Sequence, residues 1–496
     1  MTLGMPTIGK NSESIEYLHW EGNPPKDEFF WLTAINKATL VLNHRIGLIS
    51  AQNAKKWARA LQEVEEEVSV SGSHRPKTVL HFEPKLVAKC GWEITAMHAG
   101  RSSQDMHCTY QKAILRDEVL NIAEAIGEVL NNLLELCKQN TDTYLPAYTN
   151  GVAAQPETLA HIWLAHFSGF LRDLESLETW FEKHNYCPMG ATVLGGTSWP
   201  LDRKGMASYL GFKAPVYNTY DATQIAATDA PLELSLALVS PMLHVVQFIQ
   251  DVMTQYAQPR PWILVGSTYA SSAMPQKRNP GSLIDVRRDA NTVLGNLTNI
   301  IFRAHSLPPG MYDAKDSMLN ASTVREACFV LTSFATVLKM LQINKKRALE
   351  ELDLDWTATQ ELADTLMRKY SIPFRIGHHI ASQMTTFGRS NELRPSNFPY
   401  EKVCEIYQQT LEKMEMKEHP TEFPLTEEEF RNVLNPISIV NGRNVLGACQ
   451  PAEVLLMLKK ADSDLAEHKL WKTEQSHVIK NALDRCQRDF NALMES

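Results

Sequence analysis

Residues 270–280 bring together several groups that can do chemistry. They carry the hydroxyls of Ser271 and Ser272, the ammonium of Lys277 and the amide of Asn279. Asn279 suits a helix N-cap and Pro280 the first helical position, and an apolar pattern of helical spacing follows. The dipole and free N–H groups of a helix N-terminus favour an anion. The stretch therefore predicts an anion-binding loop; the alternative is a polar loop that only caps a core helix.

Long helices must position this loop. Apolar residues recur every three or four positions over most of the middle of the chain, which predicts amphipathic helices. Several exceed the usual globular length, and this favours a bundle of long helices. Strand signals are few. The expected helices start near 28 and cover 51–68, about 115–136, 164–177, 232–256, 280–304 and 324–341.

The sequence changes character near Thr357. From there, prolines break the chain into shorter helical segments, which predicts a separate smaller domain. The first forty residues are polar and turn-rich, and they predict an arm that precedes the first helix.

Composition excludes several classes of protein. The chain has 496 residues, with 44% hydrophobic and 21% charged residues, as in globular proteins of two or three domains. A formal charge of -8 without a basic cluster argues against a nucleic-acid surface. The eight cysteines form no Cys-x-x-Cys pair, so neither a metal site nor a disulfide scaffold is expected. No signal peptide or apolar run of membrane-spanning length is found, so we expect a cytoplasmic protein without a membrane partner.

The loop 270–280 resembles the signature of the fumarase/aspartase superfamily. Two serines, a variable residue, Met-Pro, a lysine and Asn-Pro stand at the superfamily's spacing, with Ala270 in place of the usual glycine. Further stretches resemble the argininosuccinate lyase branch, in the same order along the chain. These stretches are 98–105, 148–156, 196–203, 210–222, 362–380 and 441–447.

The resemblance implies an all-α (mainly α) subunit of three domains. They would comprise an N-terminal domain, 1–107, a central long-helix domain with the signature loop, 108–356, and a small helical C-terminal domain, 357–496. Central helices of four subunits would form a twenty-helix core. Each active site would combine three stretches from three different chains of this homotetramer.

The resemblance also implies a reaction, an anti elimination that releases fumarate from a succinyl group. Removing the Cβ proton places a second charge on a carboxylate, which preorganised donors must stabilise. Ser272 is the expected base, although a serine needs N–H groups and a cation to favour its oxyanion. Lys277 is the second catalytic residue, and the alternative for both is an exposed loop group. No metal or cofactor is expected. The expected substrate-binding residues are Arg101, Ser102, Ser103, Gln104, Thr149, Asn150, Ser271, Met274 and Asn279.

Four departures from the family pattern bear on the substrate. Asn150 and Ile284 stand where relatives have a paired histidine and glutamate, and the helical phase points the adjacent Asp285 elsewhere. Ser103 and Gln104 replace an arginine and an asparagine that grip the substrate. The segment that contacts the arginine-like end is shortened to 311–316. Ala270 occupies a loop position where only glycine reaches positive φ cheaply.

Other residues have two interpretations each. His98, His107 and His161 are candidate acids in place of the lost histidine, although a lone histidine is more often structural. Arg101 either grips a carboxylate or packs, and Thr149 either binds substrate or bonds to backbone. The tryptophans Trp163 and Trp199 are expected in the core.

Three functional hypotheses follow. The first is an active lyase that splits an N-substituted aspartate, either argininosuccinate into arginine and fumarate or a related aminodicarboxylate such as ethylenediamine-disuccinate. The second is a catalytically silent, crystallin-like structural or binding paralogue, which the missing His–Glu pair favours and the intact Ser272, Lys277 and Asn279 oppose. The third is an adduct-forming enzyme of secondary metabolism. Because an amine that departs easily needs little help from an acid, the departures favour amine leaving groups.

Overall fold

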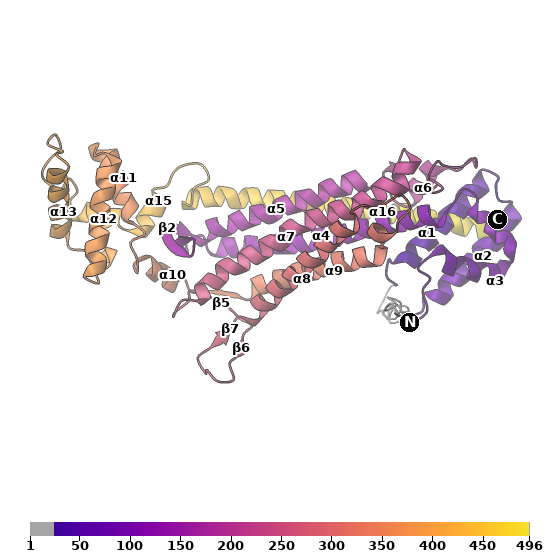
Figure 1. The fold of residues 1–496 in the computed structure, drawn as a ribbon, viewed down its shortest axis with the longest axis horizontal. Helices are drawn as coiled ribbons and strands as arrows, with labels where there is room; N and C mark the ends of the chain where they lie inside the picture. The colour runs from indigo at the N-terminus through magenta and orange to yellow at the C-terminus, as the bar shows by residue number, and fades with distance from the viewer. Residues whose placement is uncertain (1–23, 496) are drawn as a thin grey trace, which may run out of the picture.

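The computed structural model describes residues 24–495, and the expected arm at the N-terminus lies largely outside them. Long helices run side by side through the middle of an elongated molecule (Figure 1). They confirm the mainly α-helical class expected from the sequence. Five of the long helices are α4 (Ser103–Gln139), α5 (Leu159–His184), α7 (Ala226–Tyr256), α8 (Gly281–Arg303) and α9 (Ser317–Lys339).

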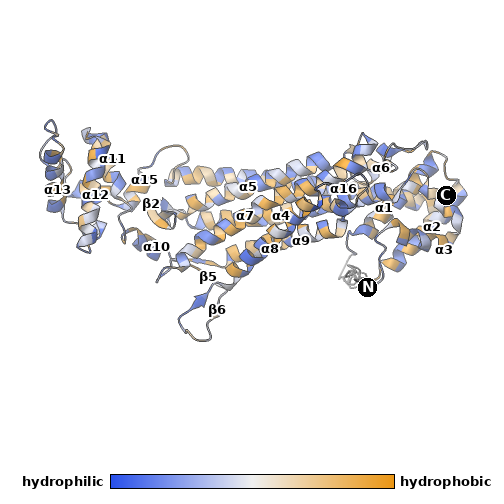
Figure 2. Ribbon diagram, viewed as in Figure 1, coloured by the Kyte–Doolittle hydropathy of each residue, from blue (hydrophilic) through white to orange (hydrophobic). Residues whose placement is uncertain are grey.

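Apolar stripes hold this bundle together. In α8 the buried positions are Leu283, Val286, Ala290, Val293, Leu297 and Ile300. The expected last position, Ile301, is only half-buried, and its neighbour Ile300 takes its place. Figure 2 shows hydrophobic segments along α4, α5, α7, α8 and α9. Burial of such stripes supplies most of the stability of a helix in a protein.

Shorter helices cover one end of the bundle. They are α1 (Glu28–Arg45), α2 (Ala51–Val68), α3 (Val79–Cys90), the 3₁₀ helix η3 (Trp92–His98) and α6 (Arg203–Tyr209). The helix α16 (Pro451–Glu495) then returns along the bundle and packs against α4, α2 and α1. The sequence grouped α16 with the small C-terminal domain, but the apolar residues of α16 belong to the main core. The three domain boundaries otherwise stay predictions.

A second core lies at the opposite end of the molecule (Figure 1). Trp356, Phe398 and Phe430 are among its buried residues. Gly388 faces the Trp356 indole so closely that no Cβ fits there. The elements of this region are α10 (Lys345–Leu352), α11 (Thr359–Tyr370), α12 (Phe374–Ser390), η6 (Pro395–Asn397), α13 (Tyr400–Lys413), α14 (Glu427–Val433) and α15 (Pro436–Asn441).

Four two-stranded ladders complete the fold in the described residues. β1 (Tyr144–Thr149) and β2 (Val152–Thr158) form an antiparallel hairpin between α4 and α5. β6 (Tyr269–Ala270) and β7 (Arg278–Asn279) are antiparallel, as are β5 (Ile263–Val265) and β8 (Leu341–Ile343). β3 (Tyr186–Cys187) and β4 (Ala214–Pro215) are parallel.

Two helical segments are long and apolar enough to cross a membrane by length and composition. They are Asp221–Tyr256 and Ser317–Lys339, so the expectation that no apolar run approaches that length is wrong by this criterion. Both lie among the other helices of the bundle, and 44% and 56% of their apolar windows are buried in the chain. Core helices of soluble proteins pass the same test, so the segments are weak evidence for a membrane.

Candidate active site

The signature residues lie on an extended arm, residues 266–280, that projects from the bundle (Figure 1). The ladder of β6 and β7 closes the base of this signature arm, and the Asn279 amide donates to the carbonyl of Tyr269 at 3.2 Å. Because Asn279 is held in this ladder, it does not cap α8. The helix starts one residue later than predicted, with Pro280 at the N-cap and Gly281 as its first residue.

The two serines of the arm differ in their hydrogen bonds. The hydroxyl oxygen of Ser271 accepts the backbone N–H groups of Ala273 at 3.3 Å and Met274 at 3.0 Å. Ser272 is exposed, and within the described chain its hydroxyl makes no hydrogen bond. Because N–H donors favour an oxyanion over a neutral hydroxyl, Ser271 has in this chain the donors that a serine base needs, and the choice of Ser272 as the base stays a prediction.

The remaining arm residues face solvent in the single chain. Lys277 and Met274 are exposed, and Lys277 forms no ion pair with any residue that the structure describes. Figure 2 shows a hydrophilic strand in the ladder of the arm. The arm therefore presents a hydroxyl, an ammonium and backbone N–H groups without any contact to the other predicted site residues.

The second predicted stretch is the tip of the β1–β2 hairpin. Thr149 pairs with Val152, and the two residues between them, Asn150 and Gly151, have φ of 54° and 78°. Positive φ at both central positions is the pattern of a type I′ turn, for which Asn-Gly is strongly preferred. Asn150 therefore has a backbone role that explains an asparagine here without any contact to substrate.

The third stretch caps the N-terminus of α4. The Ser102 hydroxyl accepts the N–H of Gln104 at 3.3 Å, and Asp105 accepts the N–H of Ser102 at 2.8 Å. Ser103 is exposed and Gln104 half-buried. The helix begins at Ser103, five residues before the boundary predicted between the first two domains.

Asp105 organises this region, and the sequence alone did not single it out as a site residue. Its side chain is 0% exposed, and besides Ser102 it accepts the N–H groups of Gly190 at 3.1 Å and Thr192 at 3.2 Å. Burial raises the pKa of the Asp105 carboxyl, and these three donors oppose the rise. The position of Asp105 three residues after Ser102 is the spacing of a capping box and could have identified it.

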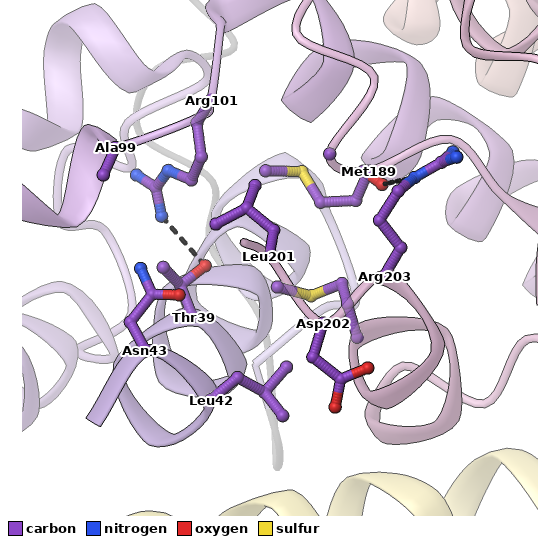
Figure 3. A pocket seen from close by; sticks show the side chains of 11 residues that line it. Thr39, Leu42, Asn43, Ala99, Arg101, Met189, Leu201, Asp202 and Arg203 are labelled. Carbon is purple, nitrogen blue, oxygen red and sulfur yellow. Dashed lines mark hydrogen bonds between the residues drawn. The ribbon is translucent and has the colours of Figure 1, made fainter. Parts of the chain in front are cut away.

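Arg101 packs beneath this helix start (Figure 3). Its guanidinium is buried and donates to Asn36 at 2.9 Å and Thr39 at 3.1 Å. Burial lowers the pKa of Arg101 to about 10, which leaves it charged at neutral pH. A small cavity beside it is lined by Met189, Leu201 and other side chains of α1 and the 189–206 segment. In the single chain Arg101 is thus packed against α1, and a contact between Arg101 and a substrate carboxylate stays a prediction.

The segment 311–316 rests on α4. The Tyr312 ring stacks on His107 with centroids 4.7 Å apart, and the Lys315 ammonium donates to the carbonyl of Thr223 at 2.8 Å. Thr223 belongs to the π-helical turn η4 (Asp221–Ile225), a feature that is frequent at functional sites. Burial, reinforced by the charge of Lys315, lowers the pKa of His107 to about 4. His107 is thus neutral and enclosed, which does not suit a general acid.

Backbone strain accumulates in the neighbouring loop. Thr192 and Val193 have φ of 46° and 73°, which is rare for β-branched residues. The Thr192 N–H bond to Asp105 and a hydrogen bond from the Gln224 amide to the carbonyl of Val193, 3.1 Å, hold the loop in place. Such strain persists only where the surroundings impose it, often near functional sites.

The other sequence candidates lie apart from these groups. Ile284 is half-buried in α8, and Asp285 is exposed and paired with Arg288 at 3.0 Å. His98 is half-buried, and burial together with Arg101 lowers its pKa. Trp163 is buried as expected, but Trp199 is 51% exposed, so the expectation for Trp199 is wrong.

One chain does not bring the three stretches together. The first stretch starts α4 and the hairpin follows the end of α4. Because α4 has 37 residues, its ends lie about 55 Å apart at 1.5 Å per residue. No residue cluster that could hold a metal is found in the described part of the chain.

Comparisons with known proteins agree with these features. Residues 20–295 match the family described as Lyase, and residues 355–441 match the family described as Argininosuccinate lyase C-terminal. The argininosuccinate lyase of Acetivibrio thermocellus is 30% identical over 76% of this chain and 79% of its own length. The argininosuccinate lyase of Methanosarcina acetivorans is 27% identical over 93% of this chain and 91% of its own length.

Solved structures show the same fold. A variant of EDDS lyase with bound fumarate superimposes with a TM-score of 0.84, at 21% identity over 94% of this chain and 92% of that one. A class II fumarase from Schistosoma mansoni gives a TM-score of 0.65 at 16% identity, over 84% of this chain and 90% of that one.

Proposed function

This chain belongs to the argininosuccinate lyase family of the fumarase/aspartase superfamily, and we propose that it splits an N-substituted aspartate by anti elimination. It is a carbon–nitrogen lyase that releases fumarate and an amine. The candidate substrates are argininosuccinate and related aminodicarboxylates such as ethylenediamine-disuccinate. Similarity to enzymes throughout the chain favours this function over a silent, crystallin-like paralogue.

The observation that carries the proposal is the geometry of the signature arm. Ser271 accepts two backbone N–H groups, and Lys277 stands six residues further along the same arm. A serine acts as a base as its oxyanion, which these donors and a nearby cation stabilise. We assign the removal of the Cβ proton to this serine pair, with Ser271 preferred over Ser272.

The other charge in the reaction sits on the succinyl carboxylates. After proton removal, the carboxylate next to Cβ carries a second negative charge and needs donors in fixed positions. Lys277 and the free N–H groups at the start of α8 supply positive charge on the arm. Ser103, Gln104 and Thr149 provide exposed or half-buried donors on the other two stretches.

Such a site requires several copies of the chain, and we propose a homotetramer that works in the cytoplasm. The predicted stretches lie at opposite ends of α4, and the arm extends into solvent. Large apolar side chains that are half or more exposed mark the bundle, and another subunit could cover them. They are Leu236 and Leu243 of α7, Phe302 of α8 and Phe329 of α9. Eight free cysteines suit a reducing compartment.

The experiment is a fumarate assay. The purified chain is incubated with argininosuccinate, ethylenediamine-disuccinate and other N-substituted aspartates, and the absorbance of fumarate is followed. Light scattering beside it should give about four times the 56.0 kDa of one chain. Fumarate from at least one substrate supports the proposal. A folded protein that releases no fumarate from the panel and adds no amine to fumarate contradicts it, and an active monomer contradicts the shared site.

A further inference from the structure

His161 lies in the first turn of α5, at the base of the β1–β2 hairpin, and contacts two other parts of the chain. Its Nδ1 atom is 3.1 Å from a carboxylate oxygen of Glu157 in β2. Its Nε2 atom is 3.0 Å from the carbonyl oxygen of Gly447, in the loop 442–450 between α15 and α16. The imidazole thus joins the hairpin to the loop that leads out of the small domain.

Both partners of the ring are hydrogen-bond acceptors. A carboxylate and a carbonyl accept only, so both ring nitrogens must carry a proton, which is the imidazolium form. The bond to Glu157 raises the pKa of His161 above its ordinary value, and burial opposes the rise. Burial alone would raise the pKa of Glu157, but His161 and the N–H of Thr158, 3.0 Å away, lower it.

Other charged and titratable groups surround this contact, and one of them, Arg443, also joins the loop to the hairpin. Arg443 donates to the carbonyl of Pro156 at 3.1 Å and to the side chain of Gln155 at 3.1 Å. Glu453 accepts the N–H of Gly447 at 2.9 Å. Cys449 is neutral, because burial raises its pKa to about 11. Among these groups, His161 alone has an ordinary pKa near neutrality.

The hairpin can transmit a movement from its base to its tip. Its ladder is antiparallel and continuous from Tyr144 paired with Thr158 to Thr149 paired with Val152, apart from a bulge at Ala147. The seven residues of β2 span about 23 Å at 3.3 Å per residue. A change of angle at Glu157 therefore displaces Thr149 and Asn150, which lie at the far end.

We propose that protonated His161 is a positioning residue for the lyase reaction, because it locks the β1–β2 hairpin onto the loop 442–450. The link to catalysis rests on the function proposed above. The direction of the pH dependence follows from the charge. The contact is complete below the folded-state pKa of His161, and it is lost as the pH rises through that value, since one ring nitrogen then faces an acceptor without a proton.

The first test is hydrogen exchange of the full-length protein near pH 6.5 and pH 8.5, corrected for the intrinsic rate. The variants are His161→Gln and Glu157→Gln. The control is His166→Gln, because His166 lies on the same helix but contacts Asp251 of α7 at 3.1 Å. Wild type and control should lose about tenfold in protection at 144–158 and 442–449 at the higher pH. His161→Gln and Glu157→Gln should be poorly protected in these two segments at both pH values. Wild-type protection in His161→Gln overturns the proposal.

The second test is the pH profile of kcat and KM on a substrate that yields fumarate. In His161→Gln, kcat/KM should fall about tenfold near pH 6.5 and lose the alkaline limb that His161 causes, while His166→Gln keeps the wild-type profile. Exchange that changes as expected with an unchanged kinetic profile overturns the positioning role. If no substrate is turned over, the lyase proposal fails, and the exchange experiment still decides whether His161 locks the hairpin.

Discussion

The signature arm and the N-terminus of α4 differ in how their polar groups are satisfied. At α4, Asp105 is fully buried and accepts three backbone N–H groups, and Arg101 donates to two side chains of α1. On the arm, Lys277 and Ser272 are exposed, and the side-chain hydrogen bonds of Ser271 and Asn279 stay within the arm itself. The polar groups at the start of α4 are paired within one chain, whereas the side chains of Lys277 and Ser272 of the arm have no partner among the described residues.

Because of this difference, we expect the start of α4 to contribute mainly to the stability of the folded chain and the arm to contribute mainly to the reaction. Removing a buried acceptor leaves several donors unsatisfied, at about 1–3 kcal/mol each. Removing an exposed group costs almost nothing in the folded chain. Substitutions on the arm should therefore change the reaction and leave the folded state intact, and substitutions at Asp105 should do the reverse.

The largest effect is expected at Ser271. If its oxyanion removes the Cβ proton, Ser271→Ala should lower kcat by at least about a thousandfold, or roughly 4 kcal/mol of barrier. The thermal midpoint and the assembly state should remain unchanged, because the hydroxyl bonds only within an exposed turn. Steady-state kinetics beside a melting curve measure both.

Ser272→Ala is the matched comparison. Ser272 has the same side chain one residue away, without the two N–H donors. We expect Ser272→Ala to keep at least about a tenth of the wild-type kcat. If the thousandfold loss falls on Ser272→Ala instead, the original sequence-based choice of base is right and the hydrogen bonds of Ser271 are structural.

A comparable effect on stability is expected at Asp105. Asp105→Ala leaves the N–H groups of Ser102, Gly190 and Thr192 without an acceptor. The free energy of unfolding should fall by about 3 kcal/mol or more. Asp285→Ala, at an exposed carboxylate on α8, should stay within about 0.5 kcal/mol of wild type. Equal urea midpoints for the two variants would remove the contrast between the regions.

Apolar periodicity and motif spacing predicted part of the fold that surrounds these two regions. The second helix occupies the expected residues 51–68, because its apolar spacing and its Ser50 cap both act locally. The choice between Ser271 and Ser272 depends on which hydroxyl meets the N–H groups of a turn, and spacing does not encode that. The burial of Arg101 likewise depends on α1, which is distant in sequence. For α16, proline spacing suggested short helices, but its apolar residues find partners in the bundle.

A substitution at Lys277 tests whether the exposed ammonium of the arm binds a group outside the chain, such as the substrate. Its ammonium is exposed and unpaired among the described residues, so Lys277→Ala should not affect folding. Because it would attract substrate charge in both ground and transition states, we expect kcat/KM to fall about a hundredfold through both kcat and KM. The adjacent Arg278 is equally exposed, and Arg278→Ala serves as the control. Similar small losses in both variants would place the substrate carboxylates elsewhere.

The smallest effects are expected at Asn150, which stands at a hairpin tip that is exposed but has a fixed backbone conformation. With φ of 54°, the position suits asparagine or glycine, and Asn150→Ala should cost about 1 kcal/mol of stability. Asn150→Gly removes the amide but keeps the turn, so we expect near wild-type stability and turnover. Asn150→His should not raise activity, since Ile284 supplies no carboxylate partner. A tenfold or greater loss of kcat in a stable Asn150→Gly would instead mean that the amide contacts substrate, as the family resemblance predicts.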